Sequence, residues 1–409
     1  MKPRLTAPLS SLIATLLLCG WGCGSSHAAP SPGAYQLRYS FGAYPDGSEP
    51  DGGLVADAAG NLYGTTRAGG RMHGGTVYRI DGASGAESVL HSFDHTNPYD
   101  AWQPSGSMVL DSSDHLYGVA ARGGGGWGAG AVFTLDLQAR AETLLHSFTG
   151  GAADGAAPSD ALLRDAQGDL FGTTPFGGAN STGTLFEITP DGHETVLASF
   201  GEAESGAPAI PSGNLALDAA GHLYGTTQFG GMYNYGTVWQ FTPASGSTPA
   251  ALKVLHSFAF APADGEQPTG GVVLDAATGT LYGTTENGGA NNAGTVFRCG
   301  IDGSSESIVH AFGDSSSSDG MWPMAPLVID GTGTLYGTTE SGGVGHGTVF
   351  ALDPATGIET VLHRFGGYAA GDGSSPGRAQ LLIDAAGELV GTTRTGGAED
   401  NGTVYALPR

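Results

Sequence analysis

Lysine is nearly missing from this sequence of 409 residues, in which it occurs only as Lys2 and Lys253. Lysine and arginine together number 15, whereas aspartate and glutamate number 39, so the formal net charge is -24. Nucleic acids and anionic membrane surfaces bind clustered cationic side chains, and this chain has few of them. We therefore expect no nucleic-acid partner and no electrostatic attachment to a membrane.

Cysteine is also scarce, and two of the three cysteines, Cys19 and Cys23, lie near the N-terminus, which leaves Cys299 alone in the rest of the chain. The sequence therefore has no disulfide framework. It also has no HExxH pattern or Cys–His cluster of the kind that binds zinc, so no metal site is expected. Helical periodicity is absent after the N-terminal segment. Stability must come from the packing of β-structure.

The N-terminal segment has the pattern of an export signal, because Lys2 and Arg4 precede the short apolar run LSSLIATLLLC. A transmembrane helix needs about 20 apolar residues, more than this run contains. Two processing routes fit: cleavage of a signal peptide (1–28) after Ala28, or removal of a lipoprotein signal (1–22) with a lipid attached to Cys23.

Residues 29–34 then form a linker, and a single domain spans residues 35–409. The expected location is outside the cytoplasm, as a periplasmic or secreted protein or as an outer-membrane or cell-surface lipoprotein. In the second case the lipid anchor is the expected membrane contact. We expect a monomer.

A ten-residue motif is repeated seven times along the chain; its first copy is NLYGTTRAGG and its most divergent copy is HLYGVAARGG. The central glycine recurs about every 54 residues. The seven glycines are Gly64, Gly118, Gly172, Gly225, Gly283, Gly337 and Gly391. Because glycines recur at fixed offsets, they indicate turns and close packing in a repeated structure, despite their high total of 72.

Each repeat contains four short apolar runs, which in the first repeat are GLVAD, NLYGTT, GTVYRI and SVLHSF. The runs are rich in β-branched and aromatic residues and are bounded by Gly, Asp or Pro, as is typical of β-strands. Four strands in about 50 residues, repeated seven times, predict an all-β fold, a seven-bladed β-propeller with four antiparallel strands per blade.

The two ends of the domain predict how the ring closes. The domain opens with YQLRYSF, which matches the fourth run of the other repeats, and ends with GTVYALPR, which matches the third run. An N-terminal strand is therefore predicted to complete the last blade, which removes the unpaired edge of a linear stack. An open β-solenoid is the alternative.

These residues resemble a known family. The pattern DAAGNLYGTTRAGG followed by GTVYRI, VLHSF and DGxxP loops is similar to the GloVer tandem repeat of bacterial exported proteins. The resemblance extends from about residue 35 to the C-terminus and implies an exported repeat protein. It implies no activity and no catalytic residues.

Residues that depart from the repeat are the candidates for a binding site, since loops on a rigid scaffold carry function. The irregular aromatic side chains fall in the longer loops, where such residues often stack on sugars or anchor partners. Packing against the blade edge is the alternative for each. The candidates are Trp102, Trp127, Phe229, Tyr233, Tyr235 and Trp322.

Arginines form a second group of candidates. Arg67 follows the TT pair of the first repeat and Arg394 follows that of the seventh, which are neighbours in a closed ring, and Arg122 lies nearby in the second repeat. Three arginines on adjacent blades against an acidic background could bind a carboxylate or a phosphate. Local pairing with acidic residues on nearby loops is the alternative.

Two polar residue types recur in the repeats. A histidine occupies one position of the fourth run in five repeats, and we expect hydrogen bonding within the blade, because equivalent positions lie too far apart around a ring to share an ion. An aspartate heads the DGxxP loops, where turn chemistry competes with a ring of carboxylates that holds Ca²⁺. The histidines are His91, His146, His256, His310 and His363. The aspartates are Asp46, Asp100, Asp154, Asp264, Asp319 and Asp372.

The sequence contains no catalytic motif, so we expect a non-enzymatic scaffold, associated with the cell surface, that binds glycan or protein ligands on its long-loop face. The alternative is a carbohydrate-active enzyme, a polysaccharide hydrolase or lyase, built on the same ring. That function would need two carboxylates about 5–10 Å apart, or a comparable group of side chains, at the channel mouth.

Overall fold

The structure is a computed structural model that describes residues 34–126, 128–201, 206–259, 261–313 and 319–409. Within these ranges the chain is built from β-strands, with one short 3-10 helix, η2 (Tyr368–Ala370), so the predicted all-β class is confirmed. No helix in the described part is long and apolar enough to cross a membrane. The predicted signal segment, most of the linker, Cys23 and Trp127 lie outside the described residues.

The strands form antiparallel sheets that follow the sequence repeats, each with the strand order expected from the four apolar runs. Repeats one to three contain β3 (Val55–Ala56), β4 (Leu62–Thr66), β6 (His73–Ile80), β7 (Glu87–Asp94); β8 (Ala101–Leu110), β9 (His115–Gly123), β10 (Ala131–Asp136), β11 (Ala141–Ser147); and β13 (Leu163–Arg164), β14 (Leu170–Thr174), β16 (Thr184–Ile188), β17 (Glu194–Ser199). Repeats four and five contain β18 (Pro208–Leu217), β19 (Leu223–Gly230), β20 (Thr237–Thr242), β21 (Ala251–Ser257); and β22 (Gly265–Asp275), β23 (Thr280–Gly288), β24 (Thr295–Gly300), β25 (Ser307–Ala311). Repeats six and seven contain β27 (Val328–Ile329), β28 (Leu335–Thr339), β30 (Thr348–Asp353), β31 (Ile358–Arg364); and β33 (Leu382–Ile383), β34 (Glu388–Thr393), β36 (Thr403–Pro408).

Four two-stranded ribbons join the DGxxP loop of a repeat to its GG turn. They are β2 (Gly47–Ser48) with β5 (Ala68–Gly69), β12 (Gly155–Ala156) with β15 (Phe176–Gly177), β26 (Gly320–Met321) with β29 (Ser341–Gly342), and β32 (Gly373–Ser374) with β35 (Thr395–Gly396). In repeats two, four and five the same residues belong to longer strands.

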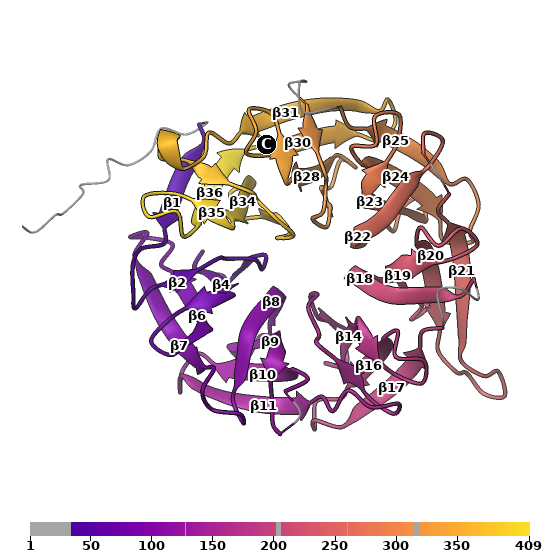
Figure 1. Cartoon of the computed structure of the whole chain (residues 1–409), viewed down its shortest axis with the longest axis horizontal. Helices are drawn as coiled ribbons and strands as arrows, with labels where there is room; N and C mark the ends of the chain where they lie inside the picture. Colours follow the sequence, from indigo (N-terminus) through magenta and orange to yellow (C-terminus); the bar gives the residue numbers. More distant parts are fainter. Residues whose placement is uncertain (1–33, 127, 202–205, 260, 314–318) are drawn as a thin grey trace, which may run out of the picture.

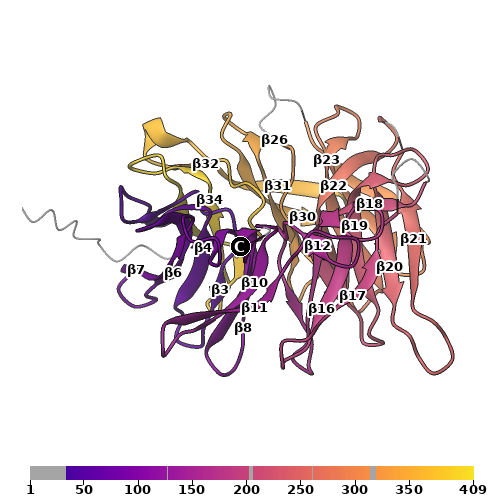
Figure 2. The ribbon, with the colours of Figure 1, turned by 60° about the horizontal axis from the view of Figure 1, so that its bottom comes forward.

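The sheets are arranged around a central axis, with the first strand of each repeat innermost (Figure 1). Figure 2, turned by 60° from that view, shows loops extending from both ends of the strands. The two ends of the described chain lie together, because β1 (Gln36–Ser40) pairs with β36 in antiparallel register, with Leu37 opposite Tyr405 and Ser40 opposite Thr403. Phe41 is fully buried in a cluster with Tyr78 of the first repeat and Val404 of the last.

The glycine at the centre of each motif makes room for an aromatic ring of the next strand. A Cβ at Gly64 would lie 2.4 Å from the hydroxyl of Tyr78, and one at Gly225 would lie 2.5 Å from the ring of Trp239. At Gly64 and Gly225 the nearest atoms belong to that aromatic side chain, whereas at Gly283 the carbonyl oxygen of Gly271 and the ring of Phe297 are equally near, at 2.5 Å.

The second threonine of the motif pairs with a threonine across the sheet. Thr174 and Thr184 have Oγ1 atoms 2.8 Å apart, and the Thr174 hydroxyl also donates to the carbonyl of Phe176. Both side chains are buried, so these bonds satisfy hydroxyls that would otherwise be costly to bury. In the divergent second repeat both positions are alanines, Ala120 and Ala131, which lie opposite each other in the sheet.

Replacement of the central glycine is expected to destabilise the fold. Gly225→Ala forces a methyl group into the ring of Trp239, and such overpacking should lower the free energy of unfolding by about 1–3 kcal/mol. Urea denaturation measures the change. The matched control is Gly331→Ala, where a Cβ would meet nothing within 4 Å and the loss should be small. Equal effects at the two positions would contradict this account of the motif.

Candidate functional site

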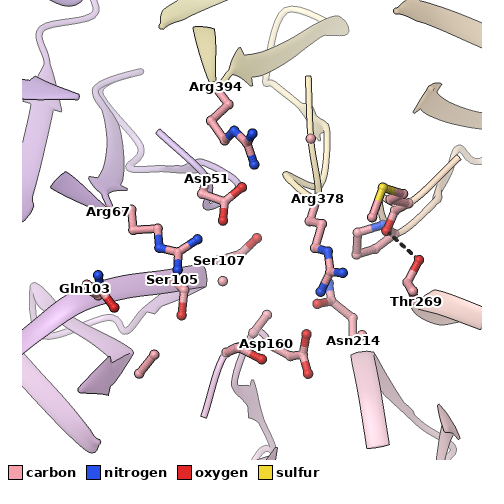
Figure 3. A pocket seen from close by; sticks show the side chains of 18 of the residues that line it. Asp51, Arg67, Gln103, Ser105, Ser107, Asp160, Asn214, Thr269, Arg378 and Arg394 are labelled. Atoms are coloured by element: carbon pink, nitrogen blue, oxygen red, sulfur yellow. Dashed lines mark hydrogen bonds between the residues drawn. The ribbon is translucent and has the colours of Figure 1, made fainter. Parts of the chain in front are cut away.

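A cavity of about 400 Å³, which we call the mouth cavity, lies where the innermost strands begin. Residues from all seven repeats line it, and Figure 3 shows their polar side chains directed toward one opening. Its lining includes Asp51, Arg67, Gln103, Ser105, Ser107, Asp160, Asn214, Thr269, Glu340, Arg378 and Arg394. Such a volume is in the range of small-molecule sites.

Three arginines enter the mouth cavity from the first and last repeats. Arg67 follows β4 and Arg394 follows β34, at the same position of the repeat, and Arg378 precedes β33. All three side chains are exposed and project into the opening (Figure 3). Among the described residues, none of the three guanidinium groups forms an ion pair within 4 Å. They are therefore available to an anionic ligand.

Acidic side chains share the cavity with the arginines. Burial raises the pKa of Asp160 to about 6, although the N–H of Gly213 and the charge of Arg378 act in the opposite direction. The Oδ2 atom of Asp160 is buried without a hydrogen-bond partner. Burial likewise raises the pKa of Glu340, against the charge of Arg394. The cavity therefore offers hydrogen-bond acceptors as well as cations.

An amide pair connects opposite sides of the ring beneath the mouth cavity. The Nδ2 of Asn214, in β18, donates to the Oε1 of Gln380 at 3.0 Å, and the Nε2 of Gln380 donates to the carbonyl of Leu327 at 3.1 Å. Below this pair lies a second cavity of about 600 Å³, the inner cavity, lined mostly by leucine, isoleucine and valine from the first strands, including Leu54, Leu162 and Leu381. The amide pair thus separates the polar mouth cavity from the apolar inner cavity.

The structure places two of the three predicted arginines, Arg67 and Arg394, in the mouth cavity. The third, Arg122, is exposed on β9, where it lies opposite Trp102 in the sheet and does not line the cavity. The aromatic candidates do not line it either. Trp102 packs partly buried against a core cluster shared by the first and second repeats, and Tyr235 packs against one shared by the fourth and fifth.

The remaining aromatic candidates lie outside both cavities. Tyr233 is 54% exposed and Trp322 is 38% exposed, while Phe229 is partly buried in β19. They lie in the fourth and sixth repeats, and no cavity described here gathers them. Trp127 lies outside the described residues, so its role as a ligand contact stays a prediction.

Sequence reasoning missed Arg378 and Asp160, although both break the repeat. Two residues after the loop proline, five repeats have glycine or alanine, such as Gly52, Gly106 and Ala325, whereas the third repeat has Asp160 and the seventh has Arg378. In the seventh repeat one extra residue separates the proline from the first strand, in the segment PGRAQL, and Arg378 lies in that segment. Comparison of the seven repeats position by position could have found both.

The raised pKa of Asp160 predicts a pH-dependent stability. An acid with a raised pKa stabilises the fold below its unfolded value, near pH 4, and that contribution is lost as the pH rises through about 6. Asp160→Asn removes this loss, so the variant should be more stable than the wild type at pH 8 by about 1–2 kcal/mol, after allowance for solvent screening. Urea denaturation at pH 4.5 and pH 8 tests this. A difference that does not change with pH would contradict it.

Comparison with known structures agrees with the all-β fold. Similar folds occur in the extracellular domain of BT4673, assigned as a one-component system, from B. thetaiotaomicron (TM-score 0.57, 10% identity, 91% of this chain and 39% of that chain). They also occur in an oligogalacturonate lyase in complex with manganese (TM-score 0.54, 11% identity, 89% and 90%) and in an oligogalacturonate lyase from Vibrio parahaemolyticus (TM-score 0.50, 9% identity, 88% and 89%). At these identities the likeness shows the fold alone: antiparallel sheets of the propeller type.

The chain belongs to the Gloeobacter/Verrucomicrobia repeat family, whose model matches residues 26–216 and 210–409. The family resemblance predicted from the repeated motif is therefore confirmed. This chain spans 39% of the length of the first similar structure. No curated protein matches the sequence.

Proposed function

We propose that the protein is an exported, closed seven-bladed β-propeller that binds a carboxylate-bearing glycan at its mouth cavity, without catalysis. The observation that carries the proposal is the convergence of Arg67, Arg378 and Arg394 in one opening, each without an ion pair among the described residues. An arginine can form two parallel hydrogen bonds with a carboxylate, which adds geometry to charge.

The other polar groups of the cavity favour a sugar acid over a simple anion. Asp51 and Asp160 offer acceptors to sugar hydroxyls, and Gln103, Ser105 and Asn214 offer both donors and acceptors. A phosphate would meet the same carboxylates as repelling charges. A uronic acid has one carboxylate for the arginines and several hydroxyls for the remaining groups.

Closure of the ring supports the proposal because it brings the first and last repeats together. The pairing of β1 with β36 adds a fourth strand to the sheet of the seventh repeat. Repeats four and five are connected in one eight-stranded sheet through a single parallel bridge, Asn214 to Gly271, and divide there into two blades of four strands. Arg67 and Arg394, distant in sequence, then lie on adjacent blades.

Titration with a galacturonic-acid trimer tests the proposed function, with a neutral galactose trimer as the matched control. Galacturonic acid is a suitable sugar for this test because two proteins of similar fold are named for oligogalacturonate. We expect the acidic trimer to bind, the neutral trimer to bind at least about 10-fold more weakly, and added salt to weaken the acidic one. Equal binding of the two, or no binding, would count against the proposal.

Asp160 favours a second candidate function, a polysaccharide hydrolase or lyase. Its carboxyl faces the cavity, its pKa is raised to about 6, and a group of this kind can transfer protons near neutral pH. Incubation of polygalacturonate with the protein distinguishes the two functions. Release of shorter oligomers that is lost in Asp160→Asn would support the enzyme, whereas binding without release supports the scaffold.

A further inference from the structure

A second set of polar side chains lies away from the mouth, at the junctions between neighbouring sheets. At each junction a side chain from the fourth strand of one repeat meets the first aspartate of the next DGxxP loop and a side chain from the fourth strand of the following repeat. Four junctions have the same three residues, a histidine, an aspartate and a glutamate, whose ligand atoms all lie within 4.8 Å of one another. These clusters are His91–Asp100–Glu142, His146–Asp154–Glu194, His256–Asp264–Glu306 and His310–Asp319–Glu359.

The aspartate of each cluster is held by its own loop. Asp264 accepts hydrogen bonds from the N–H of Ala259 at 2.9 Å and of Gly265 at 2.7 Å, and only 6% of this residue is exposed. The Nε2 of His256 lies 3.0 Å from Asp264 and 3.8 Å from Glu306. The ring of His256 also packs edge-on against Phe258. Backbone and packing thus aim a nitrogen and two carboxylates at one point.

The glutamate of each cluster is not satisfied by the protein. The Oε1 atoms of Glu142, Glu194, Glu306 and Glu359 are each buried without a hydrogen-bond partner in the described structure. The Nε2 atoms of His91 and His310 are also buried without one. A buried polar atom without a hydrogen bond lowers stability. Because the same unpartnered atoms occur in all four clusters, we infer that they interact with a ligand that the chain itself does not supply.

The other three junctions serve as internal comparisons. At the junction between the third and fourth repeats the three positions are Ala198, Ala207 and Leu252, so all three polar side chains are absent together. At the two junctions beside β1, a tyrosine replaces one member. Tyr39 takes the histidine position and donates to Asp46 at 2.8 Å, and Tyr35 takes the glutamate position, stacks on His363 and donates to Asp372.

We propose that the four His–Asp–Glu clusters are binding sites for divalent transition-metal ions of the Zn²⁺ class. One neutral imidazole and two carboxylates carry two negative charges, which a divalent ion balances, and the ion binds the atoms left without a partner. The imidazole nitrogen favours zinc over Ca²⁺ or Mg²⁺, which prefer oxygen ligands. Hydrogen bonds from the loop N–H groups orient the aspartate ligand from outside the site. At the tyrosine junctions a hydroxyl satisfies the aspartate directly, although the Oε1 of Glu87 beside Tyr39 also stays without a partner; the apolar junction needs no ligand.

The sequence analysis excluded only a metal ion shared by several of the repeated histidines, which is a different arrangement from these clusters. That reasoning compared histidines with one another, and they are indeed in different junctions. It did not consider that each histidine meets an aspartate and a glutamate from the next repeat, roughly 10 and 50 residues further along the chain. Four bound ions would connect the fourth strands of six repeats across four junctions and so link neighbouring sheets.

Zinc titration of the full chain, after dialysis against a chelator, tests the proposal at pH 7.5. Calorimetry and elemental analysis after gel filtration should give four zinc ions per chain, and zinc should raise the melting temperature. Equimolar Ca²⁺ and Mg²⁺ should do neither. Failure to retain zinc would overturn the proposal, and it would leave binding of the galacturonic-acid trimer at the mouth unaffected.

Two variants separate these sites from adventitious zinc on other histidines. The triple change His91→Ala, Asp100→Ala and Glu142→Leu reproduces the apolar junction of Ala198, Ala207 and Leu252. Because the same chain already contains that junction, the variant should fold, and it should bind three ions. Tyr39→His completes the cluster of Asp46 and Glu87 and should raise the number to five. A stoichiometry that stays the same in both variants would overturn the proposal.

Discussion

A chain that begins at residue 43, and so lacks β1 and Phe41, is expected to be less stable than a chain that begins at residue 34 by more than about 5 kcal/mol. The deletion removes the ladder to β36, the fully buried ring of Phe41 and the ion pair between Arg38 and Glu388, whose atoms are 2.7 Å apart. It also exposes an unpaired edge of β36, which favours aggregation. The melting temperature should fall by about 10 °C or more.

The outcome of this deletion bears directly on ring closure. A synthetic peptide of residues 34–42, added in trans, should restore part of the lost stability by pairing with β36, as in other cases of strand addition. If the shorter chain melts at the same temperature as the longer one, β1 does not complete the last sheet. The grouping of Arg67 with Arg394 would then lose its basis.

Removal of the mouth arginines should have the largest effect on ligand binding. Arg378→Leu, and likewise Arg67→Leu or Arg394→Leu, deletes charged hydrogen bonds worth about 1.5–3 kcal/mol each, so each change should weaken binding of the galacturonic-acid trimer about 10- to 100-fold. The side chains are exposed, so the fold should be unaffected. Calorimetric titration measures the affinity, and thermal melting checks the fold.

Arg122→Leu is the matched control for these changes. Arg122 is an exposed arginine of the second repeat that does not line the mouth cavity, so its removal should leave the affinity within about twofold of wild type. An effect of Arg122→Leu as large as that of Arg378→Leu would indicate that net charge, and not the mouth cavity, determines binding.

The scaffold could be predicted from the sequence because its packing rules repeat. Gly64 and its equivalents admit the aromatic ring of the next strand, and Thr174 and its equivalents pair across the sheet. Each of these contacts requires a particular residue type, so that residue recurs about every 54 residues. Local regularities of this kind are visible to anyone who aligns the repeats. The end-to-end match that predicts β1 beside β36 follows from the same alignment.

The candidate site could be predicted only in part. Arg67 and Arg394 were found because they stand at an equivalent position of two repeats that a ring brings together. Arg378 and Asp160 are single departures from the repeat. Comparison of the repeats reveals that they depart, but only the structure shows that their side chains line the mouth cavity. The junction clusters were missed because their members belong to different repeats and meet only through the packing of neighbouring sheets.

A crystal structure of the protein with a galacturonic-acid trimer tests the central claim most directly. The account predicts a carboxylate of the ligand at hydrogen-bond distance, about 2.7–3.2 Å, from the guanidinium groups of Arg67, Arg378 and Arg394. A trimer bound instead on the outer loops, against Tyr233 or Trp322, with the mouth arginines turned away from it, would contradict the account.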